Sequence, residues 1–396
     1  MSDGYKEEMM DKIKEFVYSE LIPLEPLLLN SKYAPLLESL EEKRIKVKNA
    51  GWWAPFLPSS VGGMGLSLPQ FAELSEMLGR SPLGHYAFNC QAPDVGNMEL
   101  LRQHGSNEQK EIYLKTLIDG STRSCFAMTE PNRPGSNPTW MDASATEDGD
   151  HYIINGRKWF TSAADGASFC IVMAVTDPGN KDKYSRASML IVETENPGFQ
   201  IMRNISVMGD PGEGYFSHSE VEFNDCRIHK SGLIGETGRG FKLAQERLGP
   251  GRIHHCMRWI GICERSFDLM CQRASDRSIS PGRKLLDEGV VQNWIAESRA
   301  EIDAARLLVL KCANAIETDG SFSARTEVSI IKFYVADVLR KVLDRAIQIH
   351  GALGMTDDTP LAFWYRHERG ARIYDGPDEV HKRAVAKQIL KRYSDS

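Results

Sequence analysis

The sequence lacks the cysteine and histidine spacings that mark metal or redox sites. Its eight cysteines are scattered over 396 residues without a Cys-x-x-Cys pair, so neither a zinc ribbon nor a redox dithiol is indicated. The adjacent His254 and His255 point about 100° apart on a helix and have no acidic or histidine partner four residues on, which argues against zinc. We therefore expect reduced, mostly buried thiols and no metal.

The sequence also lacks a long hydrophobic run. No stretch approaches the roughly 20 apolar residues that a membrane-spanning helix needs. The first residues, Met1-Ser-Asp-Gly-Tyr-Lys-Glu-Glu8, contain no apolar signal core and are too acidic for a typical transit peptide. The last three, Ser394-Asp-Ser396, are not the Ser-Lys-Leu peroxisomal signal. The expected location is cytoplasmic, with a mitochondrial or peroxisomal one left open because a presequence can already be missing.

Neither sign of charge dominates the chain. With 48 basic and 54 acidic residues, the formal net charge is −6, which argues against a large sequence-independent nucleic-acid surface. A basic run near the end is interpreted as a solvated helix face; it comprises Lys382, Arg383, Lys387, Lys391 and Arg392. Because 396 residues exceed the usual limit of a single core, about 250 to 300 residues, two or three cores are expected.

Hydrophobic periodicity divides the chain into three parts. Helical spacing predominates up to about residue 120, with expected helices over 9–18, 37–48, 69–78 and 107–118, the last capped by Asn107. From about 124 to 234 short β runs alternate with turns, over 152–154, 168–175, 187–193 and 220–228. Asn155-Gly156 there predicts a type I′ hairpin turn, because both central positions of that turn need positive φ.

From residue 240 onward the spacing returns to long amphipathic helices. They are expected over 241–277, 284–318, 323–350 and 379–393, and they would pack as an antiparallel four-helix bundle. The predicted domains are an N-terminal α-helical domain over 1–122, a central β domain over 123–236 and a C-terminal four-helix bundle domain over 237–396.

Two segments of the central part carry a specific chemical signal. Phe126-Ala-Met-Thr-Glu-Pro131 is followed by Asn155-Gly-Arg-Lys-Trp-Phe-Thr-Ser162. A flavin ring must be held by backbone N–H groups, a hydroxyl near its reactive nitrogen and an aromatic wall, and these segments supply such groups around turn-forming residues. They therefore predict a flavin cradle.

These segments, together with Gly62-Gly-Met-Gly-Leu66 and Tyr374-Asp-Gly-Pro-Asp-Glu379 in the same order, resemble the acyl-CoA dehydrogenase family. The resemblance implies an α+β fold with an N-terminal helical domain, a central β-barrel and a C-terminal four-helix bundle that forms the subunit interface. It further implies FAD as cofactor, a homodimer or homotetramer, and α,β-dehydrogenation of an acyl-CoA thioester. The implied electron acceptor is an electron-transferring flavoprotein.

The resemblance assigns the catalytic base to Asp375. The family places a glutamate there, in a Tyr-Glu-Gly-Thr motif, and aspartate is shorter by one methylene, roughly 1.5 Å. This departure puts ordinary straight-chain specificity in question. Some branches carry the base one residue before Arg252, but that residue is Gly251, which cannot remove a proton. By itself, Asp375-Gly-Pro-Asp378 is also typical of a surface turn.

The remaining site residues follow from the same resemblance. Arg252 matches an arginine beside the catalytic carboxylate, although an ion pair at a helix N-terminus would also account for it. Ser136 matches a serine that contacts the pantetheine of CoA, and Arg252 and Gly376 are further substrate contacts. Gly351 could equally cap a helix, and Pro377 replaces a threonine whose hydroxyl it cannot supply. The FAD contacts are expected at Phe126, Met128, Thr129, Ser136, Phe160, Thr161, Ser162, Arg277, Gln348, Gly351, Pro377 and Glu379.

Residues 248–258 and the run Asp375-Gly-Pro-Asp-Glu-Val-His381 are closer to one branch, whose members are in some cases fused to a kinase-like domain and associated with hydroxylated acyl-CoA. No kinase domain is present in this sequence. A preference for hydroxylated or long-chain acyl-CoA is thus a hypothesis. Two other functions stay open: an acyl-CoA oxidase that uses O2, and a non-catalytic relative that binds flavin or nucleic acid.

Overall fold

The computed structural model describes residues 3–320 and 322–394. Met1, Ser2, Asp395 and Ser396, on which the expected location partly rests, and the side chain of Arg392 lie outside the described residues. The chain divides into two compact units, and each is described by itself. One unit comprises Met1–Phe88 with Arg252–Ser396, and the other comprises Asn89–Gly251.

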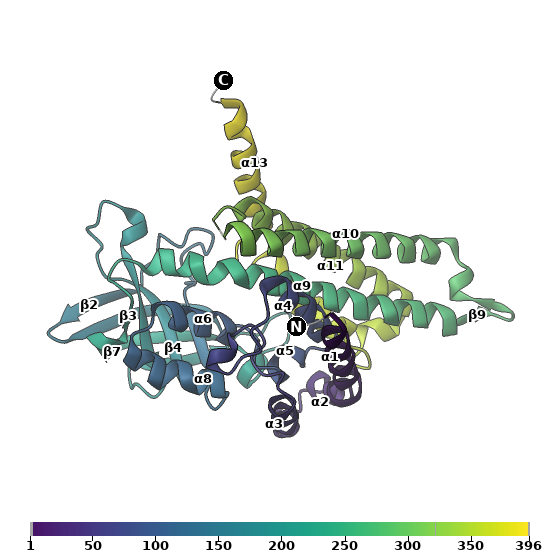
Figure 1. The fold of residues 1–396 in the computed structure, drawn as a ribbon, viewed down its shortest axis with the longest axis horizontal. Helices are drawn as coiled ribbons and strands as arrows, with labels where there is room; N and C mark the ends of the chain where they lie inside the picture. The colour runs from purple at the N-terminus through teal and green to yellow at the C-terminus, as the bar shows by residue number, and fades with distance from the viewer. Residues whose placement is uncertain (1–2, 321, 395–396) are drawn as a thin grey trace. The chain divides into compact units, whose positions relative to one another are not determined.

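The unit formed by Asn89–Gly251 is built on an eight-stranded mixed sheet (Figure 1). Its strands run in the order β6-β7-β3-β2-β4-β5-β8, and β1 pairs in parallel with β4. Strands β4 and β5 are buried along nearly their whole length because they are continuous apolar runs. The strands are β1 (Ser124–Ala127), β2 (Ser144–Asp148), β3 (His151–Ser162), β4 (Phe169–Val175), β5 (Ala187–Glu193), β6 (Phe199–Asn204), β7 (His218–His229) and β8 (Leu233–Ile234).

The predicted hairpin turn at Asn155-Gly156 is wrong. Both residues lie inside β3, where the register with β7 shifts between Ile154 and Gly156. Gly156 has φ +143°, and a Cβ there would come within 2.6 Å of Ala143, so glycine is needed for a bulge and a close approach rather than for a turn. The turn that joins β2 to β3 instead contains Gly149, at φ +58°.

The helical segment before the sheet begins at Asn107, as expected, but its cap is a different residue. Ser106, not Asn107, is the N-cap: its side chain accepts a hydrogen bond from the amide of Gln109, whose side chain in turn accepts one from the amide of Ser106. The segment is also less regular than one helix. It consists of α7 (Asn107–Gln109), a π-helical turn over Lys110–Leu114 and α8 (Lys115–Asp119), and it follows α6 (Asp94–His104).

The other unit is almost entirely helical, as the periodicity predicts. The spaced residues Ile302, Ala305, Val309 and Cys312 are all fully buried. A two-stranded hairpin, β9 (Ser278–Ser280) with β10 (Arg283–Lys284), joins α9 to α10. The helices are α1 (Asp3–Phe16), α2 (Glu25–Leu29), α3 (Tyr33–Asn49), α4 (Leu68–Gly79), α5 (Gly84–Ala87), α9 (Gly240–Asp276, which enters this unit at residue 252), α10 (Gly289–Asp319), α11 (Arg325–His350), α12 (Pro360–Glu368) and α13 (Asp378–Ser394).

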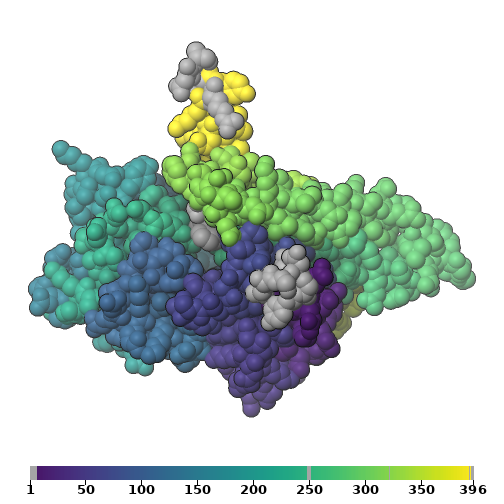
Figure 2. Space-filling model, in the orientation of Figure 1, coloured from purple at the N-terminus to yellow at the C-terminus, as the bar shows by residue number. Residues whose placement is uncertain are grey.

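Helices α10 and α11 lie side by side (Figure 1). Helix α13 contacts α11 near the start of α11 and then projects away from the pair. The space-filling view shows the same projection of the yellow C-terminal helix (Figure 2). Towards its end α13 exposes Ile389, Leu390 and Tyr393. The C-terminal helices thus agree with the expected arrangement of long antiparallel helices.

The cysteines are free thiols, and all are buried except Cys271, which is partly exposed. This confirms the expectation of buried, reduced thiols. Within residues 3–320 and 322–394, no helix is both long enough and apolar enough to cross a bilayer. The same described residues contain no group of three or more His, Cys, Asp or Glu side chains that could hold a metal ion.

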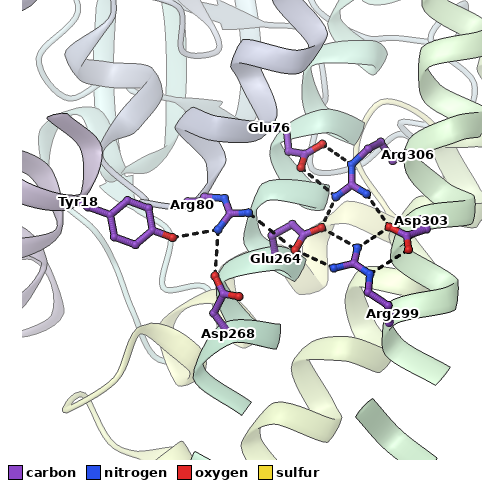
Figure 3. Close-up of polar contacts among 8 residues, drawn as sticks. All are labelled: Tyr18, Glu76, Arg80, Glu264, Asp268, Arg299, Asp303 and Arg306. Atoms are coloured by element: carbon purple, nitrogen blue, oxygen red, sulfur yellow. Dashed lines mark hydrogen bonds and ion pairs between the residues drawn. The ribbon is translucent and has the colours of Figure 1, made fainter. Parts of the chain in front are cut away.

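A network of charges ties α4, α9 and α10 together (Figure 3). Its centre is Glu264 of α9, which is 5% exposed and forms ion pairs with Arg299 and Arg306 of α10. Arg306 also donates to Glu76 of α4, with Nε–Oε2 at 2.8 Å. Burial by itself raises the pKa of Glu264, but the hydrogen bonds and charges of Arg299 and Arg306 outweigh it, so that pKa is lowered.

Replacing Glu264 is expected to destabilise the protein. Glu264→Gln removes the buried carboxylate that two partly exposed guanidinium groups share, and we expect a loss of about 3 kcal/mol. Because the folded-state pKa of Glu264 is lowered, its contribution is present above the ordinary carboxyl pKa and lost as pH falls through the lowered value. Denaturant unfolding at several pH values measures both effects. Glu8→Gln, which removes an exposed i,i+4 pair with Lys12, is the matched control and should change little.

Candidate active site

The two segments of the predicted cradle are joined directly in the sheet unit. The carbonyl of Met128 accepts a hydrogen bond from Nζ of Lys158 at 2.9 Å, and the carbonyl of Thr129 accepts one from the amide of Trp159 at 3.0 Å. The turn after β1 is thereby fixed to the middle of β3. Phe126 lies in β1, partly buried, beneath the guanidinium of Arg247 at 4.0 Å from the ring centre.

Glu130 and Lys158 form a buried ion pair beneath this turn. Nζ of Lys158 lies 2.9 Å from Oε1 of Glu130, and the lysine side chain is fully buried. The carboxylate of Glu130 also accepts the amides of Asp142 and Ala143, at 2.6 and 2.9 Å. Both ends of the loop between β1 and β2 are therefore held by one carboxylate. The sequence motif alone gives Glu130 no role beyond opening a turn.

Phe160 has a strained backbone and an exposed ring. Its φ is +49°, a left-handed conformation that is rare for a bulky residue, and 45% of the residue is exposed. The register between β3 and β7 shifts between Lys158 and Thr161, so a bulge turns this side chain outward. Strain of this kind is kept where the surrounding structure and a function require it.

The polar groups beside Phe160 include two without a partner. Nε1 of Trp159 and Oγ1 of Thr161 are buried and have no hydrogen-bond partner among the described residues. The hydroxyl of Ser162 lies 2.8 Å from Nδ1 of His218, on the neighbouring strand β7. An exposed aromatic ring, unsatisfied donors and a hydroxyl in one stretch of strand fit a flavin ring, which needs these groups.

Ser136 lies in the exposed loop between β1 and β2. Its neighbours Gly135 and Asn137 line a shallow hollow together with Met128 and Thr129. The structure therefore brings the predicted pantetheine contact into the same loop as part of the flavin cradle.

The predicted base lies in the helical unit, in a strained turn between α12 and α13. Asp375 has φ +54° and Gly376 has φ +100°. The carbonyl of Asp375 accepts hydrogen bonds from Nε of Arg252 at 3.2 Å and from Nε2 of His381 at 3.0 Å. A Cβ on Gly376 would come within 2.6 Å of the His381 ring, so this turn requires glycine there.

Burial lowers the pKa of both groups that hold this carbonyl. It lowers the pKa of Arg252, an effect that the nearby charge of Asp375 opposes. It also lowers the pKa of His381 to about 4, and the charge of Arg252 adds to that lowering. His381 is therefore neutral at neutral pH and serves as an N–H donor rather than as a charge.

A buried lysine supports the same turn from α11. Nζ of Lys332 donates to the carbonyl of Ala371 at 2.6 Å and lies 3.3 Å from the carbonyl of Gly376. Burial lowers its pKa, although the charge of Asp375 opposes this shift. No sequence motif singled out Lys332. It lies on an amphipathic helix among other charged residues, and nothing in the sequence distinguishes it as the buried lysine.

The other predicted cofactor residues of this unit lie at helix ends. Arg277 directly follows α9, Gln348 is in the last turn of α11, and Gly351 ends that helix at φ +63°, all exposed in the single chain. Gly351 is thus the cap that its sequence context allowed. At the start of α13, the carbonyl of Pro377 accepts the amides of Val380 and His381, and Glu379 is exposed.

Three family models match this chain in order and together cover most of it. They describe the N-terminal, middle and C-terminal domains of acyl-CoA dehydrogenases, and they match residues 5–121, 125–226 and 238–390. A solved structure described as a putative acyl-CoA dehydrogenase from Mycobacterium abscessus superposes with a TM-score of 0.93 at 38% identity, and each chain is covered completely.

Curated relatives agree with these matches. The chain is 44% identical over 356 residues to the probable acyl-CoA dehydrogenase FadE2 of Mycobacterium tuberculosis, covering 89% of this chain and 86% of that protein. It is 41% identical over 397 residues to acyl-CoA dehydrogenase family member 11 of Gallus gallus, covering 97% of this chain and 50% of that protein. The chain thus spans about half the length of several curated relatives that it matches.

Proposed function

Because the chain belongs to the acyl-CoA dehydrogenase family, with its N-terminal helical, middle sheet and C-terminal helical domains, we propose that it dehydrogenates an acyl-CoA thioester to the 2-enoyl-CoA. The observation that supports this most strongly is the turn at Asp375. A carboxylate is presented there on a strained backbone whose carbonyl is held by Arg252 and His381. Such strain is typical of functional positions.

In this proposal Asp375 removes the α proton of the thioester. Its side chain is 18% exposed, so it is largely shielded from water yet open to a substrate. Arg252 and His381 hold the main chain of Asp375 so that the carboxylate keeps one orientation during proton transfer. Gly376 gives the thioester close access to the backbone, because it has no Cβ.

The cofactor is FAD, which when bound accepts the hydride from the β carbon. In the sheet unit the residues that would hold it are Phe126, Met128, Thr129, Phe160, Thr161 and Ser162, with Ser136 on the CoA side. In the helical unit they would be Arg277, Gln348, Gly351, Pro377 and Glu379. The exposure of Arg277, Gln348 and Gly351 in one chain supports the further proposal that a second copy, in a homodimer or homotetramer, covers them.

Finer aspects of the proposal concern substrate and acceptor. Electrons pass to an electron-transferring flavoprotein, and the acyl group is long or hydroxylated, because the short base leaves space that an ordinary straight chain does not need. The branch with the Asp-Gly-Pro-Asp-Glu-Val-His motif is the proposed place of this chain in the family.

The test is the visible spectrum of the purified protein, followed by anaerobic addition of plain and 4-hydroxylated acyl-CoA thioesters. A yellow protein that is bleached by one of them supports the dehydrogenase and identifies the substrate class. Yellow protein that no thioester bleaches would contradict it. Rapid oxygen consumption after bleaching would instead indicate an oxidase.

Phe160→Ala is expected to weaken FAD binding by about fivefold, because an aromatic wall contributes roughly 1 kcal/mol beyond its buried area. Flavin released on ultrafiltration, measured by its fluorescence, reports the change. Tyr184→Ala removes a ring of the same unit that is 48% exposed and should leave the flavin content unchanged. Equal flavin retention by Phe160→Ala and the unmodified protein would rule out this contact.

A further inference from the structure

A histidine that no motif assigned lies against the carboxylate of Asp375. Nε2 of His255 is 3.4 Å from Oδ2 of Asp375, and the two side chains are 21% and 18% exposed. The distance is somewhat longer than an ordinary N–H···O hydrogen bond, as catalytic contacts often are without substrate. Among the residues that the structure describes, His255 is the one ion-pair partner of this carboxylate within 4 Å.

The imidazole of His255 is held in place by a buried aromatic frame. Its ring is stacked on Trp259 at 6.0 Å between ring centres and lies 5.3 Å from the ring of Tyr374. Trp259 is fully buried and donates its Nε1–H to Glu368 at 2.9 Å. The same carboxylate also pairs with Arg258. The ring of His255 is thus fixed from behind, and its free edge faces Asp375.

His255 faces Asp375 as a neutral donor. Burial lowers the pKa of His255 to about 4, although the negative charge of Asp375 opposes the shift. At neutral pH the imidazole ring is therefore uncharged, and one of its two nitrogens carries a proton. The nitrogen that faces the carboxylate must be the protonated one, because a lone pair there would repel it.

The main chain and the side chain of Asp375 are held by different groups. Arg252 and His381 bind its carbonyl, and Lys332 binds the next carbonyl, at Gly376. None of these contacts orients the carboxylate itself. An aspartate rotates about two side-chain bonds, so its oxygens are positioned only if a donor holds one of them.

We propose that His255 is a positioning residue for the catalytic base: its Nε2–H holds one oxygen of Asp375 and orients the other towards the substrate. This inference rests on the proposed function. It also gives a reason for the short base, because a longer glutamate would extend past the ring of His255. The donor is supplied by α9, 120 residues before Asp375.

Other titratable groups surround the pair and set its background charge. Positive and negative members face it from every element packed around the turn. They are Arg252, His254, Cys256 and Arg258 from α9, His85 from α5, Lys332 from α11, Glu368 from α12, Tyr374 from the turn and His381 from α13. A substitution at His255 keeps all of these residues in the chain.

The experiment compares His255→Leu, which has no donor, with His255→Gln, which keeps an N–H at similar reach. Anaerobic stopped-flow bleaching of the flavin at increasing acyl-CoA concentration gives a limiting rate and an apparent Kd. The measurement is repeated over pH 5.5–8.5, which is roughly the range where a fold is stable. We expect the limiting rate of His255→Leu to fall about tenfold to a hundredfold with Kd almost unchanged. The acidic limb of the pH–rate profile of His255→Leu should move to higher pH. His255→Gln should restore most of the limiting rate and most of the position of this limb.

A second readout does not depend on turnover. Infrared spectra of the FAD-loaded protein are recorded through a pH titration. Subtracting the spectra of the FAD-loaded Asp375→Asn variant isolates the carboxyl band of Asp375. Loss of the donor should move the protonation midpoint of this band upward by about one pH unit in His255→Leu. If His255→Leu does not fold, His255→Asn replaces it, because its amide is too short to reach the carboxylate.

The control is His104→Leu, which removes a similar histidine–carboxylate pair, His104 with Glu246 at 2.7 Å, from the other unit. It should shift neither the rate profile nor the band. An unchanged limiting rate, acidic limb and band midpoint in the donor-free variant would overturn the inference. If the unmodified protein is not bleached by any thioester, the proposed function fails, and the infrared midpoint still decides whether His255 holds Asp375.

Discussion

Asp375→Asn is expected to slow flavin reduction by acyl-CoA about 10³- to 10⁴-fold, at the upper end of what general base catalysis contributes. An amide cannot accept the α proton, so the loss should appear in the limiting rate and not in the apparent Kd. The variant should remove the base without disturbing the backbone. Asparagine is among the few residues that tolerate the left-handed backbone found at this position, φ +54°, so the turn and its hydrogen bonds should persist.

Anaerobic stopped-flow bleaching of the flavin measures the effect, and FAD content and thermal stability show that the fold is kept. Asp344→Asn, an exposed aspartate of α11 in the same unit, is the matched control and should reduce at the unmodified rate. Bleaching by Asp375→Asn within about tenfold of that rate would show that another group removes the proton, since so small a loss is below the range of a lost base.

Glu130→Gln should produce the largest loss of stability, about 3 to 5 kcal/mol, because it leaves the fully buried ammonium of Lys158 without its counter-charge. For a unit of this size that corresponds to a fall of about 10 °C in Tm. The loop between β1 and β2 also loses part of its support, since Glu130 accepts the amides of Asp142 and Ala143. Scanning calorimetry measures the change.

The pH dependence identifies the cause. Burial lowers the pKa of Lys158, and Glu130 opposes that shift, so removing Glu130 lowers it further. The folded state of the variant then binds fewer protons than the unfolded state up to the ordinary lysine pKa of about 10.4, and its stability rises with pH across that window. The double variant Glu130→Gln with Lys158→Met should recover much of the loss, because an apolar side chain can replace a buried pair. If the loss of stability is the same at every pH and the double variant does not recover it, the lost support of the loop between β1 and β2 is the cause instead.

Much of the fold could be predicted from patterns that act over a few residues. The 3.6-residue spacing of Ile302, Ala305 and Val309 placed these side chains on one face of α10, where they are fully buried. Alternating and continuous apolar runs located β3, β4, β5 and β7, including Ala187–Glu193 with the bounds predicted. They did not predict the shorter strands β1, β2, β6 and β8. The ordered motifs identified the family, because each requires backbone and side-chain groups that lie close together in the chain.

Local patterns were misleading where a distant strand or an adjacent residue decided the outcome. Asn155-Gly156 has the composition of a turn, but pairing with β2 and β7 places both residues inside β3. Ser106 rather than Asn107 caps the helix, since the glutamine that completes the capping box is three residues after Ser106. In both cases several local signals compete, and the contacts made elsewhere select one.

The sequence by itself determined the class of fold, the family and the position of the proposed base, because these depend on residue order and short-range geometry. Only the tertiary structure decided which charges meet. Lys158 pairs with Glu130 across 28 residues, Glu264 joins three elements, and His255 reaches Asp375 across 120 residues. A buried charge must find a partner wherever the folded chain brings one, and periodicity and propensity carry no information on contacts between residues so far apart.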